Sequence, residues 1–274
     1  MPRSREKFPD SRCGVVVKAR DEERAIGKCL ESLRDQTADV FLVVVNDGSV
    51  DQTSAVASEY ADVVVDLPWH AESLVGRPEL ARVVNAGLDV LKSEELDFVM
   101  LSDGEAIYPS KYIEEIARRM RNEYIVLASG VAEGEISRSF SPRGCGRVVD
   151  AEWFREIGFK YPENYGFEVY LVYKALSQCR KVVVFSDLRF KLLRKTRLSS
   201  KKVYFWGKGM KALNYNVFYA FGRAVLFSLG SPRNGVELLR GYFSDVEKYS
   251  DVEDFVSVFQ SRLLWRRARE VLGL

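Results

Sequence analysis

The strongest constraint on the fold is a regular alternation of strand and helix patterns over the first 130 residues. Five short, apolar, β-branched runs predict strands, and apolar residues between them recur at helical spacing, as in Ile26, Leu30 and Leu33. Continuous apolar runs indicate strands that are buried on both faces. We therefore predict an α/β fold with a mainly parallel sheet flanked by helices. The predicted strands are 15–17, 41–45, 63–65, 98–101 and 125–127.

The second half of the chain carries a different pattern. Residues 128–159 are rich in Gly, Ser and Arg, which predicts loops with a short helix at 151–157. A helix at 166–178 and a strand at 182–185 follow, and the pattern beyond Arg189 is helical. We predict a first domain over residues 1–190 and a helical C-terminal region over residues 191–274.

Composition excludes several classes of protein. The net charge is +2, which gives no reason to expect general nucleic-acid binding. Four cysteines without a C-x-x-C pair and a single histidine, His70, argue against a structural zinc site. The polar N-terminus lacks a signal peptide's apolar core, and the apolar run at 217–229 is shorter than the roughly 20 residues of a spanning helix. We therefore expect a cytoplasmic location.

Acidic side chains follow three of the predicted strands directly. The segments are Arg20-Asp21-Glu22-Glu23, Asn46-Asp47-Gly48-Ser49 and Ser102-Asp103-Gly104-Glu105. Each alone also fits a helix N-terminus or a turn. However, the carboxyl ends of parallel strands meet at one edge of a sheet, where ligands bind. The three segments together therefore predict a ligand site, and their carboxylates are suitable ligands for Mg²⁺ or Mn²⁺.

These segments resemble those of family-2 glycosyltransferases, which have the GT-A fold, a Rossmann-like α/β architecture. Lys18-Ala19-Arg20-Asp21-Glu22-Glu23 is similar to the family's Pro-Ala-Arg-Asn-Glu-Glu opening, and residues 44–53 to its Asp-Asp-Gly-Ser-Thr-Asp-Gly-Thr segment. Asn85-Ala86-Gly87 resembles its Asn-Ala-Gly helix. Asp103-Gly104-Glu105 stands at the position of the DXD motif, and Gly166-Phe167-Glu168 resembles the late Gly-Glu-Asp segment. The ordered series spans roughly residues 13–190.

The resemblance implies an inverting transfer of a sugar from a UDP- or GDP-linked donor. It places Ala19, Arg20, Asp21, Glu22 and Asp47 at the nucleotide. It assigns Arg82, or Arg77 in its place, to the diphosphate. Ser102 and Asp103 would contact the donor, and Asp103 and Glu105 would hold the metal. Glu168 would be the general base.

Several residues depart from the family pattern. Lys18 replaces proline, Asp21 replaces asparagine and Asn46 replaces the first aspartate of the second motif. The DXD motif is a DXE, and the Glu-Asp pair is reduced to Glu168. A degenerate, non-catalytic sugar-nucleotide-binding protein therefore remains an alternative. A sugar-phosphate nucleotidyltransferase is a weaker one, because no glycine-rich phosphate loop follows the first strand.

A basic, aromatic segment lies in the C-terminal region. Between Leu188 and Val236 there are eleven basic residues and no acidic one, interleaved with aromatic runs such as Tyr204-Phe205-Trp206. This composition suits the surface of an anionic membrane, and hence a peripheral location on its inner face with a polyprenyl-linked acceptor. A second core and a homodimer contact are the alternatives. The acceptor itself is not specified: a lipid-linked sugar, a soluble saccharide and a protein all remain open.

Overall fold

The computed structural model describes residues 8–135, 141–194 and 199–272. Its chain forms two compact units. Unit 1 comprises the described residues of 1–72, 82–161 and 179–195, and unit 2 those of 73–81, 162–178 and 196–274. The predicted domain boundary at 190/191 stays a prediction, since compactness divides the chain differently. Residues 1–7, part of the segment predicted to lack a signal peptide, lie outside the described residues, as do Lys195 and Arg197 of the basic segment.

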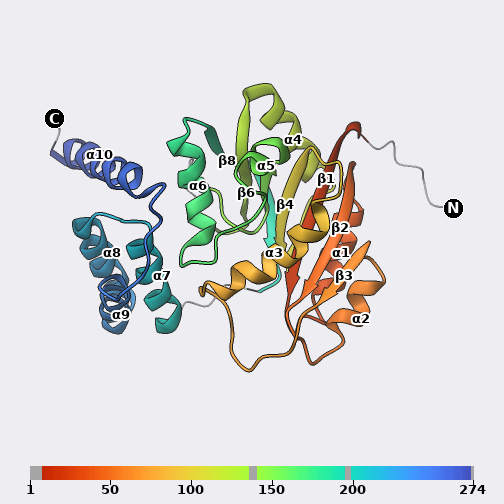
Figure 1. Cartoon of the computed structure of the whole chain (residues 1–274), viewed down its shortest axis with the longest axis horizontal. Coiled ribbons are helices and arrows are strands. Elements are labelled where there is room, and N and C mark those ends of the chain that lie inside the picture. Colours follow the sequence, from red (N-terminus) through yellow and green to blue (C-terminus); the bar gives the residue numbers. More distant parts are fainter. Residues whose placement is uncertain (1–7, 136–140, 195–198, 273–274) are drawn as a thin grey trace. The chain divides into compact units, whose positions relative to one another are not determined.

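Unit 1 is built on an eight-stranded sheet in the order β3-β2-β1-β4-β7-β6-β8-β5 (Figure 1). Four neighbouring pairs are parallel and three are antiparallel, which confirms the predicted mainly parallel sheet. The strands are β1 (Phe8–Ala19), β2 (Ala38–Asn46), β3 (Val63–Asp66), β4 (Phe98–Asp103), β5 (Ala106–Ile107), β6 (Ile125–Ala132), β7 (Arg147–Asp150) and β8 (Lys181–Leu192).

Helices cover both faces of this sheet, as the apolar strands require. Val15 and Val17 pack in one cluster with α1 (Ile26–Arg34) and α4 (Tyr112–Glu123). Val16, which points to the other face, lies against α3 (Glu79–Leu91). The remaining helices of unit 1 are α2 (Thr53–Ser58) and α5 (Ala151–Glu156). The helix predicted at 151–157 is confirmed.

Gly87 explains how α3 approaches the sheet so closely. A Cβ atom at Gly87 would lie 2.5 Å from Val16 Cγ1 and 2.9 Å from Val45 Cγ2. Two residues earlier, the Asn85 side chain donates to Tyr161 O and accepts from Tyr161 N, each at 2.8 Å. The Asn-Ala-Gly segment therefore has a structural explanation: glycine allows close packing, and asparagine holds a distant loop.

The prediction of loops over 128–159 is wrong in two places. β6 continues to Ala132, and β7 lies inside the sheet between β4 and β6. β7 pairs antiparallel with both neighbours, so it needs no crossover helix before it. The strand predicted at 182–185 is present but extends to Leu192, so the helical pattern begins later than expected.

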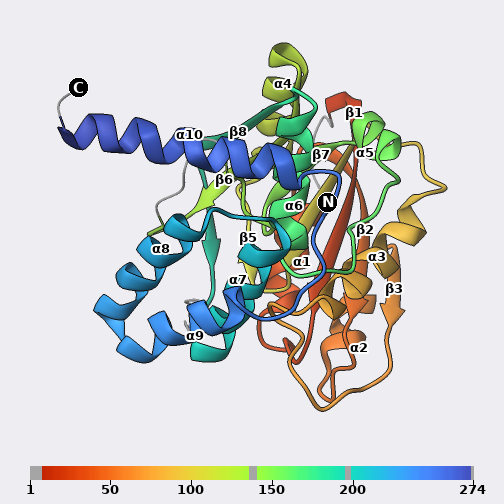
Figure 2. The same ribbon diagram turned by 60° about the vertical axis from the view of Figure 1, so that its left-hand side comes forward.

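Unit 2 is helical, and its elements are α6 (Phe167–Ser177), α7 (Ser200–Ala212), α8 (Val217–Gly230), α9 (Pro232–Tyr242) and α10 (Glu253–Leu272). Figures 1 and 2 show α7, α8 and α9 side by side. Glycines allow the contact between α7 and α9, because a Cβ atom at Gly207 would lie 2.1 Å from Leu238 O and one at Gly241 2.0 Å from Tyr204 O. Among the residues described, no helix is long and apolar enough to cross a membrane.

Candidate active site

The acidic segments meet at one edge of the sheet because of the strand register. Ala19 at the end of β1 pairs with Asn46 at the end of β2, and Lys18 pairs with Asp103 at the end of β4. Beyond the strands, Asp47 N donates to Ala19 O at 2.9 Å and Gly104 N to Lys18 O at 3.1 Å. The predicted convergence of the three segments is therefore confirmed.

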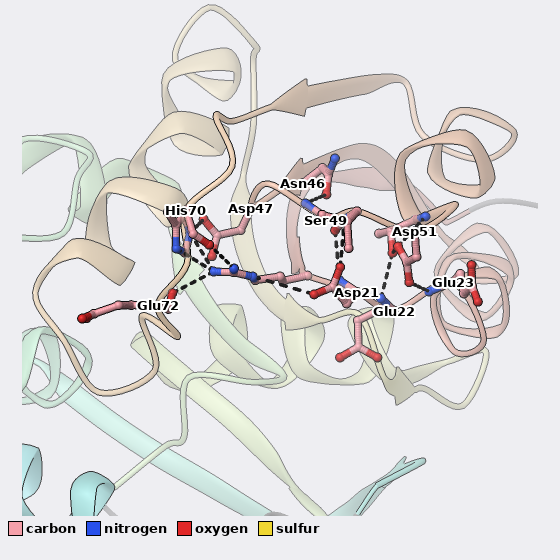
Figure 3. A network of polar contacts seen from close by, with 12 residues as sticks. Asp21, Glu22, Glu23, Asn46, Asp47, Ser49, Asp51, His70 and Glu72 are labelled. Carbon is pink, nitrogen blue, oxygen red and sulfur yellow. Dashed lines mark hydrogen bonds and ion pairs between the residues drawn. The ribbon is translucent and has the colours of Figure 1, made fainter.

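A histidine connects the first two segments (Figure 3). His70 Nε2 lies 3.0 Å from Asp47 Oδ1, and Arg20 Nη1 lies 2.6 Å from His70 Nδ1. Arg20 also donates to the carbonyl oxygens of His70 and Glu72. Arg20 Nη1 also lies 2.9 Å from His70 Nε2, so the guanidinium contacts both ring nitrogens. Asp47 is buried, at 6% exposure, and is fixed by these bonds.

Gly48 allows the histidine loop to reach this position. Its φ is +66°, which glycine adopts without strain, and a Cβ atom would lie 2.7 Å from Pro68 O and from Trp69 Cα. Any other residue would push away the backbone that carries His70.

Asp21 turns the chain at the end of β1. Its φ is +53°, and asparagine and aspartate are among the few non-glycine residues that adopt this conformation readily. Asp21 Oδ1 accepts from Val50 N at 3.0 Å, and Asp21 N donates to Ser49 Oγ at 2.9 Å. The exchange of asparagine for aspartate at this position is therefore compatible with the local backbone.

Asp51 ties the first two segments together further along. Its carboxylate accepts from Glu23 N at 3.1 Å, from Thr53 N at 2.9 Å and from Thr53 Oγ1 at 2.5 Å. Partial burial raises the pKa of Asp51, but these hydrogen bonds outweigh it, so the pKa is lowered. Glu22 N donates to Thr53 Oγ1 at 2.7 Å.

Basic side chains from the same unit neutralise the third segment. Lys18 Nζ pairs with Asp103 Oδ1, and Arg194 pairs with both Glu105 Oε2 and Glu22 Oε1, the contact to Glu105 being 2.6 Å. Lys18 is the residue that replaces the family's proline, and Arg194 follows β8 in the sequence. We call this part of the sheet edge, with Glu22, Asp103 and Glu105, the acidic edge. Its carboxylates are paired with Lys18 and Arg194 of the protein itself.

Ser102 holds the backbone of the third acidic segment in place. It is fully buried; its Oγ donates to Asp103 O at 3.1 Å and lies 3.0 Å from Tyr108 Oη. Cys29 Sγ lies 3.4 Å from Asp103 O. Since Ser102 is inaccessible, its observed role is to hold the backbone of Asp103.

Asp103 and Glu105 fit a divalent cation in chemical type. Both are carboxylates at the open edge of the sheet, and the Asp103 side chain is 37% exposed. Over the part of the chain that the structure describes, no three His, Cys, Asp or Glu side chains are grouped to hold a metal. The protein therefore offers two carboxylates, and a ligand that brings its own oxygens, such as a diphosphate, would have to complete the coordination.

Arg82 and Arg77 belong to different compact units. Arg82 is an exposed residue of α3 within unit 1. Arg77 belongs to unit 2, where its guanidinium carbon lies 5.6 Å from the centre of the Phe205 ring.

Glu168 stands in the first turn of α6, in unit 2. A carboxylate is stabilised there by the helix dipole. The helix begins at Gly166, whose φ is +76° and whose Cβ, if present, would lie 3.2 Å from Gly209 Cα of α7. Both the backbone conformation and the close approach require glycine, so Gly166 determines where Glu168 emerges.

Comparison with known proteins adds the family. The profile of Glycosyl transferase family 2 matches residues 14–170, more than half of the chain. The chain belongs to this family. The family-2 region covers the sheet edge, the DXE segment and Glu168.

Individual relatives are more distant. The 4,4'-diaponeurosporenoate glycosyltransferase of Staphylococcus aureus strain MRSA252 is 43% identical over 65 residues, which are 22% of this chain and 17% of that protein. The chain thus matches only about a sixth of the length of this curated relative.

Solved structures confirm the GT-A fold. Residues 1–349 of S. aureus TarS in complex with UDP match with a TM-score of 0.54 and 18% identity, covering 73% of this chain and 64% of that one. A mannosyltransferase from Pyrobaculum calidifontis in complex with GDP-Man and Mn²⁺ matches with a TM-score of 0.58 and 13% identity, covering 95% and 87%.

Three basic or imidazole side chains that pair with predicted site residues were not themselves predicted. They are Lys18, His70 and Arg194. Lys18 had a sequence signal, since it replaces proline in the segment that leads to Arg20. His70 is the only histidine in the chain, but its loop position gave no indication of its partners.

Proposed function

We propose that this chain transfers a sugar from a UDP- or GDP-linked donor to an acceptor by a single displacement with inversion. The observation that carries the proposal is the strand register, which gathers three acidic segments of a family-2 sequence at one sheet edge. The ligands of the structural neighbours, UDP in TarS and GDP-Man in the mannosyltransferase, support a nucleotide-linked donor.

The nucleoside contacts the first two segments in this proposal. Arg20, Asp21 and Asp47, together with Ala19 and Glu22, surround the base. Asp47 suits recognition of a base, because a buried carboxylate in a fixed position accepts hydrogen bonds from ring N–H groups. Ser102 and Asp103 contribute at the ribose, Ser102 by holding the Asp103 backbone, and Arg82 or Arg77 contacts the diphosphate.

A divalent cation, Mg²⁺ or Mn²⁺, is held by Asp103 and Glu105 in this proposal. Such an ion offsets the negative charge of the leaving diphosphate. Lys18 and Arg194, which pair with these carboxylates, would then be available to the phosphates of the donor. The Mn²⁺ in the complex of the P. calidifontis mannosyltransferase supports this part.

Glu168 is the proposed general base, which removes the proton of an acceptor hydroxyl. For the acceptor we propose a lipid-linked molecule of the polyprenyl class, received at the inner face of the membrane. The support is the basic, aromatic segment between Leu188 and Val236 and the name of the S. aureus relative, 4,4'-diaponeurosporenoate glycosyltransferase.

The test is a panel of UDP- and GDP-sugars with Mn²⁺, Mg²⁺ or EDTA, scored for thermal stabilisation and for slow donor hydrolysis. We expect one donor to stabilise the protein only when a metal is present. Asp103→Ala should abolish this metal-dependent binding, whereas Asp89→Ala, which removes an exposed carboxylate paired with Lys92, should not.

Undiminished Mn²⁺-dependent affinity in Asp103→Ala would contradict the metal role. Donor binding without hydrolysis or transfer to any acceptor tested would favour the degenerate, non-catalytic alternative.

A further inference from the structure

Helix α8 presents its large apolar side chains outward. Its buried residues are Ala220 and Ala224, whereas Phe218 is 75% and Leu229 81% exposed. Five large exposed residues follow the spacing i, i+3, i+7, i+8 and i+11, which puts them on one side of a helix. We call this side the α8 face: Phe218, Phe221, Val225, Leu226 and Leu229.

Close packing of α8 against α9 explains why Ala220 and Ala224 are the buried residues of this helix. A Cβ atom at Gly235 would lie 2.6 Å from Ala224 O and 1.9 Å from Ser228 Oγ. Small residues of α8 therefore lie where α9 approaches most closely, whereas Val217, Tyr219 and Phe227 are partly buried against the same cluster. The large residues are free to point outward, where exposure to water would normally select polar residues.

The apolar surface extends beyond α8. The rings of Phe221 and Phe243 lie 6.1 Å apart, and Phe243 is exposed. Val236 on α9 and Trp206 on α7 are exposed as well. Contiguous exposed apolar patches in soluble proteins indicate an interaction site.

The charges on the same three helices identify the partner. Between residues 200 and 242, all of them described, there are seven basic side chains and one acidic side chain. Lys201, Arg233 and Arg240 are exposed, and the Arg223 guanidinium carbon lies 5.0 Å from the centre of the Phe227 ring. A second copy of the chain would bring the same positive charge to the contact, so a homodimer is disfavoured there.

We propose that the α8 face lies in the headgroup region of an anionic membrane, with the axis of α8 parallel to the membrane plane. An anionic lipid surface offers apolar chains for the phenylalanines and leucines and negative headgroups for the surrounding lysines and arginines. The 14 residues of α8 span about 21 Å, which is too short for the roughly 30 Å hydrocarbon core. The idea that this surface receives a lipid-linked acceptor rests on the proposed function. Binding of the α8 face to a membrane does not depend on it.

Co-sedimentation with vesicles of phosphatidylglycerol and phosphatidylcholine tests the proposal. Wild-type protein should bind the anionic vesicles, bind less as salt rises, and stay in solution with pure phosphatidylcholine. Val225→Glu/Leu229→Glu should lower the partition coefficient about tenfold or more, because these side chains leave water on binding. Lys201→Glu/Arg233→Glu should lower it roughly tenfold at low salt.

Tyr124→Glu is the matched control. Tyr124 is 88% exposed in unit 1, so its change adds a single negative charge away from the α8 face and should leave binding nearly unaltered. Donor-dependent thermal stabilisation, measured on every variant, reports folding and the proposed function separately from lipid binding. Wild-type protein that stays in the supernatant with anionic vesicles at low salt overturns the proposal. So does a dimer, seen by light scattering, that Leu229→Glu dissociates.

Discussion

At the scale of single residues, one histidine makes two predicted nucleotide contacts mutually dependent. His70 bonds both Arg20 and Asp47, so the proposed nucleotide contacts are held by side chains rather than by backbone alone. Loss of His70 leaves a buried carboxylate without this partner. Mutations of Asp47 and of His70 should therefore have related effects.

Asp47→Ala should weaken binding of UDP or GDP about ten- to a hundredfold, because an unpaired buried group costs about 1–3 kcal/mol. His70→Ala should reduce affinity in the same direction by freeing Asp47 and Arg20. Isothermal titration calorimetry with both nucleotides measures the two effects. An unchanged affinity for both nucleotides in Asp47→Ala would remove Asp47 from the base pocket.

Glu168→Gln should lower turnover about 10²–10⁴-fold with a hydroxyl acceptor, because glutamine cannot accept the proton. Donor affinity should change little. With a phosphate acceptor, which is already anionic, the same variant should retain most of its turnover. Steady-state kinetics with each acceptor class separates these outcomes, and full turnover with a hydroxyl acceptor would contradict a general-base role.

The sequence predicted which residues follow the strand ends at the sheet edge. It did not predict which side chains they pair with. Asp21, Asp47 and Asp103 follow from strand patterns, because parallel strands bring their carboxyl ends together. The pairing of Glu22 with Arg194 joins residues 172 positions apart. It depends on the return of β8 into the sheet, which the local pattern does not contain.

At the scale of elements, the loops at the acidic edge are held by hydrogen bonds that aspartate carboxylates accept. Asp51 is the clearest case, since it joins the start of α2 to the segment after β1. Its bonds stabilise the folded state only while the carboxylate is charged.

Asp51→Asn should lower the free energy of unfolding by about 1–2 kcal/mol at pH 7. The pKa of Asp51 is lowered in the folded state, so its contribution is complete above the unfolded value of about 4 and is lost as pH falls through the folded pKa. The difference between variant and wild type should therefore shrink as pH falls below about 4. Urea unfolding at pH 7, 5 and 3 measures it, with the exposed Asp245→Asn as control; a gap that does not shrink between pH 5 and pH 3 would exclude this charge effect.

Element prediction succeeded for strongly apolar segments and failed for short, polar ones. β7 has four residues, begins with Arg147 and follows a Gly-, Ser- and Arg-rich stretch. Its Arg147 is nevertheless buried and donates to Pro142 O at 2.6 Å. A buried arginine at the start of a strand contradicts simple patterning, so only the tertiary structure identifies β7. The helix α4 was also not predicted, although Ile113, Ile116 and Met120 are all buried.

At the scale of the whole molecule, the family-2 architecture was predictable because many weak signals agree in order. The position of the division between compact units was not. Residues 73–81 and 162–178 belong to unit 2 although the surrounding sequence belongs to unit 1. The assignment of these two segments to unit 2 depends on long-range contacts, which a strand-and-helix pattern does not specify.

Cysteine reactivity reports on the stability of unit 1. Burial raises the pKa of the Cys29 thiol to about 12, although a bond with Ser102 lowers it, so Cys29 should react only after local opening. Cys179 is exposed and should react first. Donor at about 100 times its dissociation constant should slow Cys29 modification roughly a hundredfold, if opening disrupts the site. Mass spectrometry of alkylated peptides measures this, and equal rates with and without donor would disconnect Cys29 opening from binding.

The cations at the acidic edge would make binding of the proposed ligand an exchange of ion pairs. A free divalent ion must displace Lys18 or Arg194, and a free phosphate must draw these cations away from Asp103, Glu105 and Glu22. Either ligand alone leaves one set of charges without its counter-ion. If the edge binds a metal–diphosphate pair as proposed, that pair would replace both sets of charges at once, and the edge would favour the two arriving together over a free divalent ion or free phosphate.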